Sequence, residues 1–441
     1  MQENEDALQE SAQDGVTRRR MLRGAAAVLA APLLAESARA AAPGAQGDST
    51  LSRPLNPRPL NPDVAYGHDT LPLGIRSRFV DNNNGITMHV LEAGFEQPGR
   101  PCVVLLHGFP ELAYTWRQLL LPLAQGGFHV VAPDMRGYGR TAQTPVKFDD
   151  DLIPYTSYGL VADILGLTRA LHHEQVACVV GHDWGAPVAQ WCALIRPDVF
   201  RSVVSMSNPF YQSADLPLGT RVRPPHEDLD KTLAALPRPR KYYVSYYASR
   251  SANEDMWHAP QGVHDLLRAW YHFKSADWKG NRPFKLKSRT AAEFAKMPEY
   301  YVMDLNKGVA ATMAAAMPSA QESAACRWMT EADLAVYASE YMRTGFQGGL
   351  NLYRAFYRLD NPLAGRPIEV AALFIGGAQD WGVRQAPGAF EGMGHACTQL
   401  CGVHLIERCG HSVPEEQPQA VSRLLLEFLA QAAPHARAAP A

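Results

Sequence analysis

The stretch that decides the fold reads VACVVGHDWGA and spans residues 176–186. An apolar run of strand length enters the tight turn Gly181-His182-Asp183-Trp184-Gly185, and an amphipathic helical pattern follows it. Glycine on both sides allows a strand and a helix to approach closely and to hold Asp183 in a strained turn with its side chain accessible. This is the context of the G-x-S-x-G nucleophile elbow, with aspartate in the serine position. We therefore predict that Asp183 is a nucleophile, with a simple helix cap as the alternative.

Apolar runs of strand length alternate with helical patterns along most of the chain. The runs lie at residues 102–106, 129–132, 176–180, 202–205, 370–375 and 403–406. Because they are continuously apolar rather than alternating, they predict an α/β fold with a mostly parallel sheet and helices on both faces. Upstream, two alternating runs flank Asn82-Asn83-Asn84-Gly85, which predicts a β-hairpin.

The regular α/β alternation stops near Pro209 and resumes near Val370. The sequence between them is mostly helical in pattern and dense in tyrosine, tryptophan and phenylalanine. Its position between two sheet strands predicts an inserted helical lid over the carboxyl ends of the strands, where open α/β sheets bind ligands. A second, independent domain is the alternative.

The first forty residues predict an export signal. Thr17-Arg18-Arg19-Arg20-Met21-Leu22-Arg23 precedes an apolar run at residues 24–35, and an A-x-A site lies at Ala38-Arg39-Ala40. This order is typical of a twin-arginine signal, and the apolar run is shorter than the roughly twenty residues that span a bilayer. We expect cleavage after Ala40 and a periplasmic or secreted protein; a disordered basic tail is the alternative.

The predicted organisation has five parts. A segment rich in proline, asparagine and glycine follows the signal and predicts an extended arm. The parts are the signal at 1–40, the arm at 41–78, the first part of the α/β core at 79–209, the lid at 210–361 and the second part of the core at 362–434.

Composition excludes several kinds of partner. The 441 residues carry 42 Lys and Arg against 44 Asp and Glu, so no long-range field recruits nucleic acid or an anionic membrane surface. A small-molecule partner is expected. Seven cysteines cannot all pair within one molecule; Cys397 and Cys401, in a polar stretch, could form a bridge, and the sequence leaves the pairing open.

Two further turns carry a family resemblance. His107-Gly108-Phe109-Pro110-Glu111 follows one predicted strand, and Pro133-Asp134-Met135-Arg136-Gly137-Tyr138-Gly139-Arg140 follows the next. With the Asp183 elbow, these motifs make the chain from about Phe79 to Leu429 resemble the α/β-hydrolase-fold epoxide hydrolases. Haloalkane and fluoroacetate dehalogenases share the motifs, so they indicate a branch of the fold rather than a substrate.

The resemblance implies the remaining catalytic groups. His411 is the expected base for ester hydrolysis and Asp380 the acid that orients it, in the chain order of nucleophile, acid and histidine. Backbone N–H groups of Phe109 and Trp184 are the expected oxyanion donors. The side chains of His107, Pro110 and Trp184 are expected in the substrate pocket.

Two lid tyrosines are expected to hold the epoxide oxygen. A departing alkoxide needs a hydrogen-bond donor, and phenols with a pKa of about 10 stay protonated at neutral pH. Lys241-Tyr242-Tyr243-Val244-Ser245-Tyr246-Tyr247 resembles the family segment with the first donor and selects Tyr243, although a slip in register would select Tyr242 or Tyr246. The segment from Phe346 to Arg354 selects Tyr353.

The resemblance therefore implies hydrolysis of a small apolar epoxide by water to a vicinal diol, without a cofactor or a metal. A dehalogenase with the same nucleophile is the first alternative, because some dehalogenases place a halide-binding indole at the position of Trp184. A non-catalytic exported binding protein on the same fold is an alternative from another class.

Overall fold

The computed structural model describes residues 69–142, 145–210, 226–358 and 365–432. The predicted export signal at 1–40 lies outside the described residues, as does the predicted arm up to residue 68. The segments 211–225 and 359–364, where the predicted lid begins and ends, also lie outside them.

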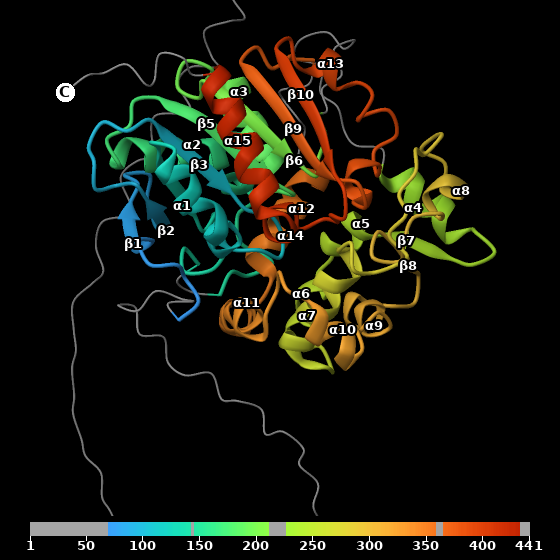
Figure 1. The fold of residues 1–441 in the computed structure, drawn as a ribbon. Coiled ribbons are helices and arrows are strands. Elements are labelled where there is room, and N and C mark those ends of the chain that lie inside the picture. Colours follow the sequence, from blue (N-terminus) through green and yellow to red (C-terminus); the bar gives the residue numbers. More distant parts are fainter. Residues whose placement is uncertain (1–68, 143–144, 211–225, 359–364, 433–441) are drawn as a thin grey trace, which may run out of the picture. The chain divides into compact units, whose positions relative to one another are not determined.

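Eight strands form the central sheet (Figure 1), in the order β1-β2-β4-β3-β5-β6-β9-β10. In chain order they are β1 (Arg76–Asp81), β2 (Thr87–Ala93), β3 (Cys102–Leu106), β4 (His129–Pro133), β5 (Val176–His182), β6 (Ser202–Met206), β9 (Ala371–Gly377) and β10 (Leu400–Ile406). β2 runs antiparallel to both β1 and β4, and all other neighbouring pairs are parallel. The predicted hairpin and the mostly parallel sheet are therefore confirmed.

Helices cover both faces of this sheet. The chain moves from β3 to β4 through α1 in one direction, then across β3 to β5 through α2 and on to β6 through α3 in the other. Because such crossovers are right-handed, the reversal places α1 on one face and α2 and α3 on the opposite face. The last helix, α15, packs against α1 and crosses in front of the sheet in Figure 1. The helices of the core are η1 (Ala113–Trp116), α1 (Arg117–Gln125), η2 (Ile153–Tyr155), α2 (Ser157–Ala170), α3 (Gly185–Ile195), η3 (Trp381–Val383), α13 (Met393–Ala396), α14 (Val413–Glu416) and α15 (Pro418–Ala432).

Most of the continuously apolar runs are buried as their pattern predicts, and the run at 403–406 is the exception. Every residue of β3, β4, β5 and β6 is buried, because helices cover both sides of these strands. The edge strand β10 is different, since none of its residues is fully buried.

A mostly helical segment lies between β6 and β9. Its helices are α4 (His226–Ala234), α5 (Tyr243–Tyr247), α6 (Ser251–Trp257), α7 (Gly262–Lys274), α8 (Ala291–Phe294), α9 (Val309–Ala314), α10 (Ala320–Ala325), α11 (Glu331–Thr344) and α12 (Gln347–Arg358). A two-stranded antiparallel sheet of β7 (Arg240–Tyr242) and β8 (Val302–Asp304), which the helical pattern did not predict, joins them.

This inserted segment is anchored on the loops that follow the sheet strands. The hydroxyl of Tyr271 donates to the carbonyl of Pro110 at 3.0 Å, and that of Tyr341 donates to the carbonyl of Glu111 at 3.1 Å. The buried guanidinium of Arg117 lies 3.1 Å from Asp333 of α11, within the insertion. The insertion therefore covers the carboxyl ends of the strands, which is where the predicted catalytic residues lie.

Candidate active site

Asp183 occupies the sharp turn between β5 and α3. Its φ of +47° lies in the left-handed region, which costs a residue with a side chain about 1–2 kcal/mol. The turn closes because the flanking glycines are in backbone contact: a Cβ on Gly181 would lie 2.0 Å from the carbonyl oxygen of Gly185, and one on Gly185 would lie 2.1 Å from that of Leu106. The sequence pattern thus produces the strained elbow turn that was predicted around Asp183.

The carboxylate of Asp183 is held between two partners. Its Oδ1 accepts a hydrogen bond from the backbone N–H of Phe109 at 2.9 Å, and its Oδ2 lies 3.3 Å from Nε2 of His411. Burial favours a raised pKa, but the hydrogen bond and charge of His411 and the charge of Lys274 lower the pKa of Asp183 below its usual range. The group is therefore an ionised carboxylate at neutral pH.

His411 and Asp380 complete the predicted triad. Nδ1 of His411 lies 3.1 Å from Oδ1 of Asp380, which also accepts a hydrogen bond from the N–H of Gly382 at 2.7 Å. Burial opposes ionisation of Asp380, but the charge of His411 and its hydrogen bond leave the pKa of Asp380 lowered. The imidazole thus lies between two carboxylates, one at each ring nitrogen.

Of the candidate lid tyrosines, Tyr243 and Tyr353 lie together near Asp183. Their ring centroids are 6.0 Å apart, and burial followed by the nearby charge of Asp183 raises the pKa of Tyr353 well above its usual value. The hydroxyl of Tyr246 instead donates to Asp255 at 2.9 Å. Tyr242 packs its ring against Phe294. The structure therefore brings together the pair that the sequence selected.

The Tyr243 hydroxyl is connected to the elbow through two amides. It donates to Oε1 of Gln385 at 3.2 Å, and Nε2 of Gln385 donates to Oδ1 of Asn208 at 3.1 Å. Nδ2 of Asn208 then donates to the carbonyl oxygen of Asp183 at 2.7 Å. Burial, then the charges of other groups nearby, raises the pKa of Tyr243 well above its usual value, so its hydroxyl keeps its proton.

Comparison with known proteins assigns the chain to a family. A family model described as alpha/beta hydrolase fold matches residues 101–418. Epoxide hydrolase B of Mycobacterium tuberculosis is 33% identical over 366 residues, covering 79% of this chain and 96% of that protein. The chain belongs to the epoxide hydrolase family.

Solved epoxide hydrolases share the fold over most of the chain. An epoxide hydrolase from an endophytic Streptomyces is 31% identical with a TM-score of 0.64, covering 81% of this chain and 96% of that one. Potato (Solanum tuberosum) epoxide hydrolase I is 29% identical with a TM-score of 0.62, covering 81% and 99%.

The other predicted pocket residues of this epoxide hydrolase lie around the elbow. The indole of Trp184 packs edge-on against Tyr353, with centroids 5.0 Å apart. Both ring nitrogens of His107 have backbone partners. Nδ1 lies 2.9 Å from the carbonyl oxygen of Gly108, and Nε2 accepts a hydrogen bond from the N–H of Met135 at 3.0 Å. His107 therefore braces the turn that presents the N–H of Phe109.

A buried ion pair, which the sequence reasoning did not assign, supports the same turn. Nδ1 of His182 lies 2.9 Å from Oε2 of Glu111, which also accepts from the N–H of Gly108 at 2.9 Å. Nε2 of His182 donates to the carbonyl of His411 at 2.7 Å. Burial opposes the charge on His182, but the carboxylate of Glu111 raises its pKa to about 9. His182 lies in the elbow motif and Glu111 in the turn after β3. Their positions in these motifs are the signal from which the ion pair could have been predicted.

Lys274 is a second group that the sequence did not indicate. It is buried at the end of α7, with its ammonium 4.2 Å from the centroid of Trp270, and its carbonyl accepts from the N–H of His411 at 3.0 Å. Burial lowers the pKa of Lys274, while the carboxylates of Asp183 and Asp380 oppose that effect. Nothing in the local sequence distinguishes this lysine from solvated ones.

Other kinds of site are not seen in the described part of this epoxide hydrolase. No three or more His, Cys, Asp or Glu side chains there are arranged to hold a metal ion. No helix among the described residues is long and apolar enough to cross a membrane. All seven cysteines are free thiols, including Cys397 and Cys401.

Proposed function

We propose that the protein hydrolyses an apolar epoxide to a vicinal diol in two steps, through a covalent ester on Asp183. The observation that carries the proposal is an ionised carboxylate that contacts a histidine and has a pair of protonated phenols nearby. Aromatic side chains of Phe109, Trp184 and Tyr247 surround the pair, which favours an apolar substrate.

The first step opens the ring. The Asp183 carboxylate attacks an epoxide carbon, the C–O bond breaks, and the oxygen receives a hydrogen bond and then a proton from Tyr243 or Tyr353. The raised pKa of both phenols supports their role as donors, because neither ionises near neutral pH. The product is an alkyl ester of Asp183.

The second step hydrolyses that ester. Nε2 of His411 takes a proton from water, the resulting hydroxide attacks the ester carbonyl, and the hydroxide proton leaves with the alcohol, so that Asp183 is again a carboxylate. The proton held by His411 then restores the phenol that ionised in the first step. The N–H of Phe109 already points at an oxygen of this group and would stabilise the oxyanion, with the N–H of Trp184 as the second donor. Ester formation removes a negative charge beside His411, which lowers its pKa and favours the neutral base.

Halide displacement is the second candidate reaction, because Trp184 lies next to the nucleophile. Its indole, however, is packed edge-on by Tyr353 and Phe356. The paired phenols favour a leaving group that must be protonated as it departs. An alkoxide must be protonated, whereas a halide leaves as a stable anion. Turnover of haloalkanes or fluoroacetate, without turnover of any aryl or alkyl epoxide, would support the dehalogenase instead.

A single-turnover experiment in ¹⁸O-water tests the covalent step. With enzyme in excess, the diol should carry unlabelled oxygen and the peptide containing Asp183 should gain ¹⁸O. The His411→Gln variant should accumulate an adduct of substrate mass on Asp183, while His404→Gln, at an exposed position on β10, should not. Labelled diol in the first turnover, with no adduct in His411→Gln, would mean direct attack by water.

We also propose export through the twin-arginine route, supported by the pattern from Thr17 to Arg23 and the site at Ala40. Replacing Arg18 and Arg19 by lysine should leave the precursor in the cytoplasm, as seen by fractionation and immunoblotting. Normal export of that variant would contradict the proposal.

A further inference from the structure

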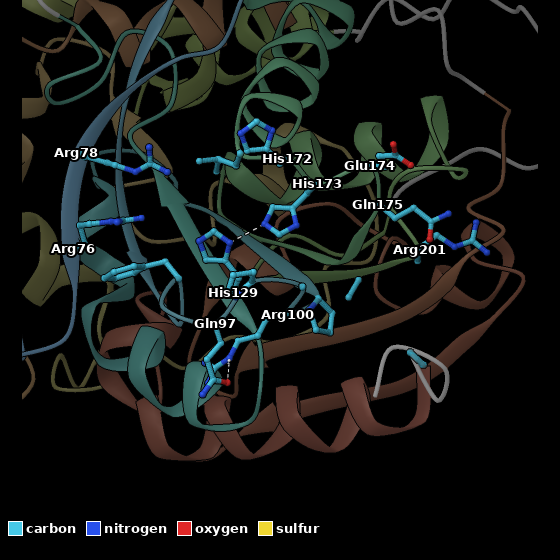
Figure 2. Close-up of a pocket in the computed structure, with 17 residues that line it drawn as sticks. Arg76, Arg78, Gln97, Arg100, His129, His172, His173, Glu174, Gln175 and Arg201 are labelled. Atoms are coloured by element: carbon cyan, nitrogen blue, oxygen red, sulfur yellow. Dashed lines mark hydrogen bonds between the residues drawn. The ribbon is translucent and has the colours of Figure 1, made fainter. Parts of the chain in front are cut away.

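A cavity of about 890 Å³ lies at the amino ends of β3, β4 and β5 (Figure 2). The predicted catalytic groups follow the carboxyl ends of the same sheet. Seven residues of β5 separate the two regions, which corresponds to about 20 Å at 3.3 Å per residue. A ligand in this cavity would therefore not contact Asp183 or His411.

Positive charge is concentrated around this cavity. Among its described lining residues, Glu174 is the only carboxylate. The same lining contains four arginines: Arg76, Arg78, Arg100 and Arg201. One further carboxylate, the buried Glu92, lies beneath Arg76 and Arg78. The four guanidinium charges exceed the two carboxylate charges by two in a chain whose formal net charge is −2. The excess of positive charge is therefore specific to the surroundings of this cavity.

Glu92 orients two of these guanidinium groups. Its Oε1 accepts from Nε of Arg76 at 2.8 Å and from Nε of Arg78 at 2.5 Å. Burial favours the neutral acid, but hydrogen bonds from His129, Arg78 and Arg76 lower the pKa of Glu92 to about 2. Because the bonds use Nε, the terminal nitrogens of both arginines have no hydrogen-bond acceptor among the described residues. These are the nitrogens that bind oxyanions in pairs.

The other two arginines are held by neutral groups, which leave their charge uncompensated. Arg100 donates to Oε1 of Gln97 at 2.8 Å and to the carbonyl of Ala124 at 3.0 Å. Arg201 donates to the carbonyl of Pro197 at 3.0 Å. Anion sites are built from such preorganised donors, because little side-chain entropy remains to be lost on binding.

Two histidines form the polar floor of the cavity. Nδ1 of His129 and Nε2 of His173 lie 2.7 Å apart, and Figure 2 shows the two rings facing one another. Burial and the neighbouring His129 lower the pKa of His173 to about 4. His173 is therefore neutral at neutral pH, and the arginines carry the positive charge that would attract a ligand.

We propose that this cavity is a binding site for a small organic dianion that carries phosphate or carboxylate groups. The excess of two positive charges matches a dianion, and the volume exceeds the size of an inorganic oxyanion, leaving room for an organic part. Binding stabilises the fold through linkage and leaves the turnover of epoxide unchanged, because the site is distant from the triad.

Thermal unfolding of the full chain, titrated with phosphate or succinate at constant ionic strength, tests the proposal. The melting temperature should rise to saturation with at least one anion. Arg201→Gln removes a charge from an exposed position and should weaken binding about tenfold. Glu174→Gln removes the opposing carboxylate and should tighten it. Arg423→Gln, at an exposed arginine on α15, should bind like the wild type.

Comparison of the two anions shows which class of ligand the site binds. Saturation by phosphate alone assigns the site to phosphate-bearing ligands, and saturation by succinate alone assigns it to dicarboxylates. Equal stabilisation by sodium chloride, or equal affinity in the Arg201→Gln, Glu174→Gln and Arg423→Gln proteins, would refute the proposal. Competition between the anion and the epoxide would also refute it, because that outcome places the anion at the triad.

Discussion

Replacing Lys274 by methionine tests how buried charges set the basicity of His411. The Lys274 ammonium is 4.2 Å from the Trp270 ring centroid, and that ring is 6.0 Å from the ring of His411. The ammonium therefore lies within about 10 Å of the imidazole. Burial and Lys274 both lower the pKa of His411, whereas Asp380 and Asp183 raise it, and the carboxylates prevail. Lys274 thus opposes protonation of the proposed base.

The expected magnitude follows from Coulomb's law. Two unit charges about 10 Å apart interact by about 1.7 kcal/mol at an effective dielectric constant of 20, which is roughly a tenfold change in proton affinity. Loss of Lys274 removes this repulsion, so His411 is protonated more readily and its neutral fraction falls at a given pH. The acid limb of kcat should move upward by about one pH unit, and ester hydrolysis should slow below it.

Rapid-quench mass spectrometry across pH 5–9 separates the two steps. In Lys274→Met, formation of the Asp183 ester should stay near the wild-type rate, while its decay should slow at low pH and recover at high pH. Lys241→Met is the matched control, because that ammonium also lies 4.2 Å from an aromatic ring, Tyr246, but at a half-buried position away from the triad. An unmoved acid limb in folded Lys274→Met, or an equal shift in Lys241→Met, would refute the reasoning.

Two further predictions concern the phenols and the buried ion pair. Tyr243→Phe and Tyr353→Phe should each slow ring opening by about 10²-fold in a pre-steady-state assay, by analogy with loss of an oxyanion donor. Tyr246→Phe should leave the rate of ring opening nearly unchanged in the same assay. Slow ring opening by the Tyr246→Phe enzyme would contradict the assignment. Glu111→Gln should lower the free energy of unfolding by about 3–5 kcal/mol in urea titrations, because it leaves His182 buried without its carboxylate. The stabilisation from His182 is complete below about pH 6.5 and lost as the pH rises through about 9, so the difference between Glu111→Gln and wild type should shrink at high pH; a constant difference would count against the ion pair.

The fold could be predicted because its signals are local. A strand buried on both faces needs a continuous apolar run, and the six predicted runs all became strands of the sheet. The elbow could also be predicted from its local sequence, because only glycine allows the backbone contact between Gly181 and Gly185. The small sheet of β7 and β8 was not predicted, since three-residue strands carry no periodicity that could be read within a helical pattern.

The sequence by itself determined which residue types end the strands: an aspartate in the elbow, an acid after β9 and a histidine after β10. Parallel strands end at the same edge of a sheet, and this order together with the family resemblance predicted that Asp183, Asp380 and His411 meet. Only the tertiary structure decided that Tyr243 rather than Tyr246 lies beside Tyr353, since residues three apart lie near the same face of a helix and only the packing of that helix decides which of them meets a given partner. It alone also placed Lys274 beside the triad, because burial and the charge balance among groups distant in the chain arise only when the elements pack together.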